Sequence, residues 1–124
     1  MERADAADTG TEAVLAQKEE VRVGARVLLD DIPAAIRGRR VGLLTNHTGI
    51  VAAGPGDVVS TVDLLHDHPD IDLVALFGPE HGIRGTAEAG EHVDSSVDEA
   101  TGLPVHSLYG GSMKPTPEML DGVE

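Results

Sequence analysis

The stretch IDLVALFGPEHGIRG, residues 71–85, joins an apolar run to a loop that is dense in polar side chains. Its first seven residues show little alternation between apolar and polar types, which is typical of a strand covered on both faces in a parallel sheet. The chain then places Glu80, His81 and Arg84 among three glycines directly after that strand. The stretch therefore predicts a buried strand that delivers a charged loop at its end.

Segments of strand and helix length alternate on both sides of this stretch. Apolar runs of strand length lie at 39–46 and 103–110. Between the first two strands, the segment 57–70 predicts an amphipathic helix that Asp57 or Ser60 caps. The order of strand, helix, strand, long loop and strand predicts an α/β fold with an open parallel sheet.

Shorter elements complete the pattern. Helices are expected over 24–31 and 115–123, the second with Thr116 as its N-cap, and loops over 47–57 and 78–102. The last helix should lead into a fourth strand, which this sequence does not contain. We therefore expect the N-terminal portion of a larger sheet, truncated after its third strand.

Three polar clusters directly follow the three predicted strands. They are TNHTG at 45–49, GPEHGIRG at 78–85 and SLYGG at 107–111. The carboxyl ends of parallel strands meet at one edge of a sheet, and ligands of open α/β sheets bind beyond that edge. The three clusters together therefore predict a ligand site there.

Composition limits the classes of partner. The 124 residues carry a formal net charge of −13, and after residue 40 the only Lys or Arg side chains are Arg84 and Lys114. A basic surface that follows a phosphate backbone is not expected, so nucleic acid is an unsuitable partner. The chain has no cysteine, which excludes a disulfide framework and a thiolate metal site.

The N-terminal residues differ from the rest of the chain. Residues 1–22 are charged, rich in alanine and low in large apolar side chains, so we expect a flexible tail before a domain at 23–124. No apolar run reaches the roughly 18 residues that cross a membrane. No signal peptide is recognisable, which favours the cytoplasm.

The loop after residue 77 has the residue types of acid–base chemistry. A carboxyl group such as Glu80, partly desolvated at the end of a buried strand, would have a raised pKa and could act as a general acid. Glycoside hydrolysis usually needs a second carboxylate, which Glu88 or Glu91 could supply. We expect no cofactor, although a metal-assisted hydrolase using His81 and His92 is an alternative.

Five motifs follow one another along the chain: VGLLTNHTG, ALFGPEHGIRG, AGEHV, TGLPVHSLYG and KPTPEML. In this order they resemble the N-terminal part of the DUF1343 family, over roughly residues 22–124. Members of that family are NamZ-type exo-β-N-acetylmuramidases, which release N-acetylmuramic acid from the non-reducing end of peptidoglycan fragments. The resemblance implies a Rossmann-like catalytic domain, a smaller C-terminal domain that is absent here, and an active site near their junction.

The resemblance also implies roles for individual residues. Glu80 matches the proposed catalytic glutamate, and His81 belongs to the same motif. The residues that match the motifs around the expected site are implied to line it and to bind substrate: Asn46, His47, Arg84, Glu91 and Tyr109.

The substrate implied by the resemblance bears a lactyl carboxylate, which a cation would bind. Arg84 could pair with it through two parallel hydrogen bonds. The alternative is a structural ion pair between Arg84 and Glu80, Glu88 or Glu91. The substrate's 2-acetamido group also leaves substrate-assisted catalysis open, in which one acid suffices.

Two expectations concern the chain as a unit. Family members continue beyond the point where this sequence stops, so activity would need the missing C-terminal part or another subunit. The non-catalytic alternative is a truncated α/β domain that binds a sugar or a partner. Family members can be exported, and a misplaced start codon in this sequence would hide a signal peptide.

Overall fold

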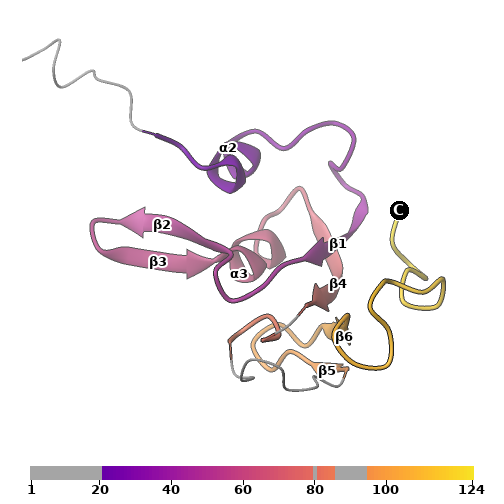
Figure 1. Cartoon of the computed structure of the whole chain (residues 1–124). Coiled ribbons are helices and arrows are strands. Elements are labelled where there is room, and N and C mark those ends of the chain that lie inside the picture. Colours follow the sequence, from indigo (N-terminus) through magenta and orange to yellow (C-terminus); the bar gives the residue numbers. More distant parts are fainter. Residues whose placement is uncertain (1–20, 80, 86–94) are drawn as a thin grey trace, which may run out of the picture.

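The computed structural model describes residues 21–79, 81–85 and 95–124 of the chain. Figure 1 shows its elements along the sequence. They are α2 (Gly24–Asp30), β1 (Arg40–Leu44), β2 (Ile50–Gly54), β3 (Asp57–Ser60), α3 (Thr61–His66), β4 (Asp72–Gly78), β5 (Ser96–Val97) and β6 (Pro104–Ser107). Among the described residues, no helix has the length and apolar character that crossing a membrane requires.

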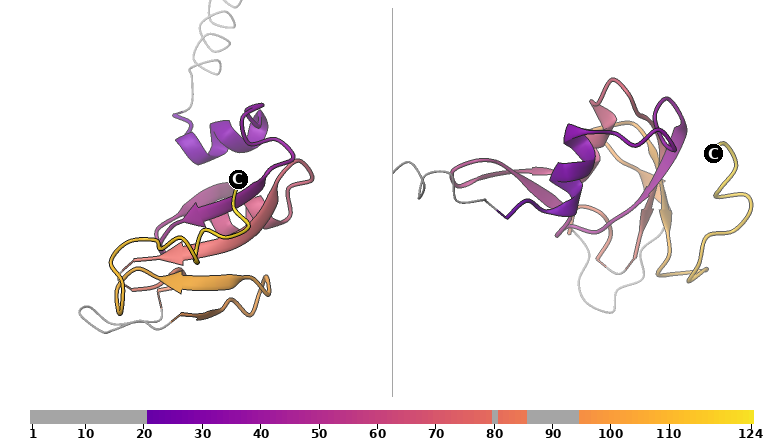
Figure 2. Two further views of the ribbon diagram at one scale, coloured as in Figure 1. Left: turned by 90° about the vertical axis from the view of Figure 1, so that its right-hand side faces the viewer. Right: turned by 90° about the horizontal axis from the view of Figure 1, so that it is seen from above.

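The main sheet confirms the predicted α/β fold. Its strand order is β1-β4-β6-β5, with β1, β4 and β6 parallel and the short β5 antiparallel to β6 (Figure 2). Phe77 of β4 is in register with Leu44 of β1 and His106 of β6. The carboxyl ends of the three parallel strands are therefore level at one edge of the sheet.

Strand β4 is buried on both faces, as its lack of alternation predicted. Leu76 has no exposed surface and belongs to the larger core cluster, which also contains Val62 and Leu65 of α3. Its neighbours Ala75 and Phe77 belong to the second cluster. Figure 2 shows α2 and α3 on one side of the sheet and the C-terminal segment on the other. Each face of β4 thus has its own cover.

The predicted loop at 47–57 is wrong, because β2 pairs with β3 as an antiparallel hairpin. The hairpin extends away from the main sheet (Figure 1). Gly56 has a φ of +75° and permits the tight turn between its strands. Short β-branched runs flank that turn, and β-branched side chains favour extended backbone.

The helix predicted to begin near Asp57 begins at Thr61 instead, because the preceding residues form β3. Ser60, one of the two proposed caps, accepts a hydrogen bond from the Val62 N–H at 3.3 Å through its Oγ. Asp57 lies in β3 and does not cap the helix.

The helix predicted at 115–123 is also wrong, since no helix forms there and residues 117–122 are turns. The Thr116 Oγ1 still accepts a hydrogen bond from the Met119 N–H at 3.3 Å, although there is no helix for it to cap. Gly122, with a φ of +90°, lies outside helical backbone and ends the turns. Met119 and Val123 then pack against the second core cluster. The domain limits at residues 22 and 23 stay predictions, because residues 1–20 lie outside the described part.

Candidate functional site

The edge formed by the carboxyl ends of β1, β4 and β6 carries the three predicted polar clusters. Backbone hydrogen bonds continue past the ends of the strands there. The Thr45 N–H donates to the Phe77 carbonyl at 3.1 Å, and the Leu108 N–H donates to the Gly78 carbonyl at 2.8 Å. The first residues of all three clusters are therefore fixed relative to one another.

The loop after β4 turns back onto the sheet within a few residues. The Gly82 N–H donates to the Pro79 carbonyl at 3.1 Å, which closes a tight turn. A Cβ on Gly78 would lie 3.2 Å from a methyl group of Ile83, and Ile83 itself is buried in the larger core cluster. A side chain at position 78 would make Ile83 shift by a few tenths of an ångström, so glycine suits this close packing of the loop over the end of its own strand.

This turn uses left-handed backbone at two consecutive residues. His81 has a φ of +69° and Gly82 a φ of +67°. Glycine adopts this conformation readily, but for histidine it is uncommon and needs support from its surroundings. Among the described residues, His81 is the one non-glycine with positive φ. Such a residue in the middle of a polar loop marks the segment as a functional candidate.

Two predicted site residues from different strands contact each other. The rings of His47, after β1, and His81, after β4, lie edge to face with centroids 5.8 Å apart. Gly85 packs against His47 so closely that a Cβ there would lie 2.8 Å from the His47 Cβ. The expectation that these loops meet at one edge is confirmed for this pair.

Asn46 and Tyr109 occupy the neighbouring strand ends. The Asn46 amide oxygen accepts hydrogen bonds from the Thr48 N–H at 3.1 Å and the Thr48 hydroxyl at 2.7 Å, which shapes its own loop. The Tyr109 N–H donates to the Ser107 hydroxyl at 3.2 Å. Contacts of either residue with a ligand stay predictions.

Four residues of the predicted chemistry lie outside the described part of the chain. They are Glu80, Glu88, Glu91 and His92. For Glu80 the described neighbours Pro79 and His81 fix its position along the chain at the end of β4.

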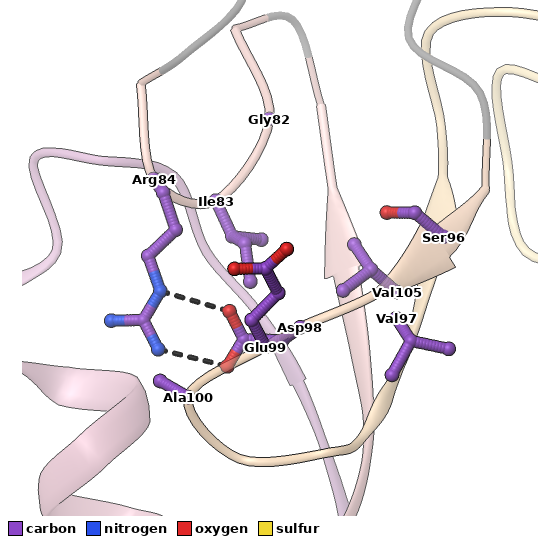
Figure 3. A pocket seen from close by; sticks show the side chains of 9 residues that line it. All are labelled: Gly82, Ile83, Arg84, Ser96, Val97, Asp98, Glu99, Ala100 and Val105. Atoms are coloured by element: carbon purple, nitrogen blue, oxygen red, sulfur yellow. Dashed lines mark hydrogen bonds and ion pairs between the residues drawn. The ribbon is translucent and has the colours of Figure 1, made fainter.

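Arg84 forms an ion pair with acids that the sequence did not indicate. Its guanidinium donates to Asp98 through Nε at 3.0 Å and Nη2 at 2.9 Å (Figure 3). It also donates to Asp63 through Nη1 at 3.1 Å and Nη2 at 3.0 Å. Four of the five guanidinium N–H groups are therefore used within the protein.

The environment of the pair strengthens it. The Asp98 side chain is only 5% exposed and the Arg84 side chain 30%. Asp98 also accepts hydrogen bonds from the Thr101 N–H at 3.1 Å and its hydroxyl at 2.7 Å. Hydrogen bonds from Arg84, with help from Thr101, hold the pKa of the Asp98 carboxyl below its ordinary value, and both aspartates raise the pKa of Arg84.

Of the two expected roles of Arg84, the described contacts support a structural ion pair, with Asp63 and Asp98 as partners. The proposed partners Glu80, Glu88 and Glu91 lie outside the described residues, and binding of a substrate carboxylate stays a prediction. A bidentate clamp on a substrate carboxylate would require Arg84 to break bonds to one aspartate. The sequence pattern did not indicate these two partners of Arg84, because Asp63 is one polar residue of an amphipathic segment and Asp98 lies in a predicted loop.

A pocket of about 460 Å³ lies beside this pair. Figure 3 shows the Arg84–Asp98 pair at one side and Val97 and Val105 at the other. The remaining lining residues are Gly82, Ile83, Ser96, Glu99 and Ala100. The pocket shares residues 82–84 with the loop after β4.

Within the described ranges, no group of three or more His, Cys, Asp or Glu side chains could hold a metal ion. His68 is used structurally: its Nε2 lies 3.2 Å from the Leu29 carbonyl, and its Nδ1 accepts from the Asp70 N–H at 3.1 Å. His92, which the metal alternative requires, is outside those ranges.

The Gly85→Ala substitution should destabilise the protein by about 1–3 kcal/mol more than Gly56→Ala. Both glycines have left-handed backbone, with φ of +72° and +75°, so both variants lose about 1–2 kcal/mol for the backbone alone. Only at Gly85 does the added methyl group collide with His47. Urea denaturation of both variants measures the difference, and equal losses would contradict the close packing.

Stability should also depend on the charge of Asp98. Since its pKa is lower in the folded protein, the ion pair contributes fully above pH ~4 and is lost as the pH falls through the folded pKa. Asp98→Asn should be less stable than the parent by about 1.5–3 kcal/mol at pH 7. Urea denaturation between pH 7 and 2 should show this difference shrinking below pH ~4, and a constant difference would refute the assignment.

Comparison with known proteins identifies relatives. A family model described as "Exo-beta-N-acetylmuramidase NamZ, N-terminal" matches residues 41–124. The chain is 50% identical over 109 residues to peptidoglycan beta-N-acetylmuramidase NamZ of Bacillus subtilis, a match that covers 88% of this chain and 25% of that protein.

A solved structure agrees with both the sequence matches and the fold. The crystal structure of a DUF1343 family protein from Bacteroides fragilis superposes with a TM-score of 0.68 at 45% identity, covering 82% of this chain and 24% of that one. The chain therefore spans about a quarter of the length of these two relatives. On this evidence the chain belongs to the NamZ exo-beta-N-acetylmuramidase family and corresponds to its N-terminal region.

Proposed function

We propose that this chain provides the Rossmann-like catalytic part of a glycoside hydrolase that releases N-acetylmuramic acid from the non-reducing end of peptidoglycan fragments. Family membership and the polar edge support this proposal together. The observation that carries it is the loop after β4, whose tight turn begins directly at the end of the central strand and brings His81 to His47. Peptidoglycan recycling and muramyl saccharides as substrates follow from the same proposal.

Glu80 is the proposed general acid. It lies in the sequence between Pro79, at the end of a buried strand, and His81, whose ring contacts His47. A carboxyl group in partly desolvated surroundings is protonated at neutral pH more readily than one in water, as proton donation to a leaving group requires. His81, His47, Asn46 and Tyr109 are proposed to contact the sugar around it.

The second carboxylate stays a proposal with two candidates, Glu88 and Glu91, and Glu91 is also proposed to contact the substrate. Catalysis assisted by the substrate's own 2-acetamido group would require neither as a nucleophile. Because Arg84 is engaged by two aspartates, the lactyl carboxylate would need another cation. We propose that Lys114 provides it.

The second candidate function is a domain that binds a muramyl saccharide without cleaving it. The observation that favours it is the contact between the His47 and His81 rings at the polar edge, because imidazole groups can hydrogen-bond a sugar without cleaving it. Calorimetry with N-acetylmuramic acid alongside an assay of hydrolysis distinguishes the two: binding without turnover supports this second function.

Glu80→Gln should lower kcat on an unactivated muramyl disaccharide by about 10²–10⁴-fold, because its leaving group is a sugar hydroxyl that needs a proton the amide cannot donate. The assay uses a protein of the relatives' full length that carries this chain as its N-terminal part. The matched control is Glu118→Gln, an exposed glutamate in the C-terminal turns, which should leave kcat unchanged. Unchanged turnover in Glu80→Gln would exclude Glu80 as the general acid.

A further inference from the structure

We propose that Asp63, Arg84 and Asp98 together position the loop of Glu80 and His81 for catalysis. This inference rests on the proposed function and adds two residues to it, neither of which lies in the polar clusters at the strand ends. The three side chains are positioning residues: they act on the reaction through the loop backbone and not by contact with the substrate.

The three side chains connect three separate parts of the fold. Asp63 lies on α3, Arg84 in the loop after β4, and Asp98 directly after β5. Each aspartate accepts two hydrogen bonds from the guanidinium, at distances of 2.9–3.1 Å. The planar group of Arg84 is thereby fixed in both position and orientation, which a single ion pair would not achieve.

Of the three side chains, that of Asp98 is the most buried and accepts the most hydrogen bonds. Its side chain is almost fully buried, and Thr101 donates two further hydrogen bonds to it from the opposite side. The Gly102 N–H also donates to the Asp98 carbonyl at 2.7 Å, and the Asp98 N–H donates to the Leu103 carbonyl at 2.9 Å. Asp98 therefore offers Arg84 a fixed anchor that belongs to the β5–β6 hairpin.

The loop has a physical need for such an anchor. His81 has left-handed backbone, which is unfavourable for a residue with a side chain and persists only where neighbouring contacts enforce it. Three successive residues supply those contacts: Ile83 is buried against the sheet, Arg84 is tied to the aspartates, and Gly85 packs on His47. The backbone geometry of His81 is thus set by the residues that follow it in the turn.

Loss of the hydrogen bonds between Arg84 and the two aspartates should affect turnover more than substrate binding. A catalytic group displaced by about 1 Å loses much of its effect on the reaction, even when the substrate still binds. Because the aspartates and Arg84 satisfy one another, their substitution changes the loop and leaves the proposed sugar contacts outside it, at Asn46, His47 and Tyr109, in place.

The experiment compares kcat and KM for Asp63→Asn, Asp98→Asn and Arg84→Lys in a protein of the relatives' full length that carries this chain. Each variant should lower kcat by about 10–100-fold, with KM changing by less than about 3-fold. Arg84→Lys keeps the charge but cannot bridge two carboxylates through a planar group, so it should not restore activity.

The matched control is Arg37→Lys. Arg37 also forms a structural ion pair, with Asp70, and donates to the Ile32 carbonyl at 2.9 Å. That pair lies before β4, at the end of the sheet opposite the polar edge. Its loss should lower the thermal midpoint without changing kcat.

A second readout on the 124-residue chain does not depend on turnover. Amide hydrogen exchange at residues 81–85 should become at least about tenfold faster in Asp98→Asn than in Arg37→Lys. Asp63→Asn, whose aspartate is partly exposed, provides the same test if Asp98→Asn fails to fold.

If the parent turns over substrate and kcat is unchanged in Asp63→Asn and Asp98→Asn, the positioning role is overturned. Full activity of Arg84→Lys would also overturn it. Unchanged exchange at residues 81–85 would overturn it as well. No turnover by the parent would instead contradict the proposed function. The hydrogen-exchange rates at residues 81–85 would then still decide whether the ion pairs of Arg84 fix the loop.

Discussion

Burial of β4 on both faces and along both edges is the constraint on which the rest of the structure depends. Parallel neighbours occupy both of its edges, and separate core clusters cover its faces. In a strand enclosed in this way, polar residues can reach solvent only at its ends. The loop that begins at Pro79 therefore lies at the edge of the sheet where the loops after β1 and β6 also emerge.

The loop itself is held by contacts of two kinds. Ile83 anchors it through apolar burial, and Arg84 anchors it through ion pairs with Asp63 and Asp98. The Asp98 carboxylate is almost fully buried and would be costly there without a partner, which Arg84 supplies. The same arrangement that satisfies these charges also fixes the backbone next to Glu80, so fold and proposed chemistry share one set of interactions.

The sequence predicted the features that depend on the burial of a continuous apolar segment. The strand at 71–77 and the meeting of His47 with His81 followed from apolar runs and from the geometry of parallel sheets. The hairpin at Ile50–Ser60 was missed because Val58 and Val62 happen to have helical spacing although Val58 lies in a strand.

The partners of Arg84 were missed for a different reason. Asp98 reaches Arg84 only because β5 pairs with β6, and Asp63 only because α3 packs beside the loop. Contacts of this kind depend on tertiary arrangement and leave no local spacing signal in the sequence.

The most direct test of this account is a double-mutant cycle between Asp98→Asn and Glu80→Gln, measured as kcat in a full-length protein that carries the chain. If Asp98 acts through the geometry of the Glu80 loop, its substitution should have little further effect once the catalytic carboxyl group is gone. Losses that multiply, with Asp98→Asn lowering the residual rate as much as it lowers that of the parent, would contradict the claim that the ion pair serves the carboxylate.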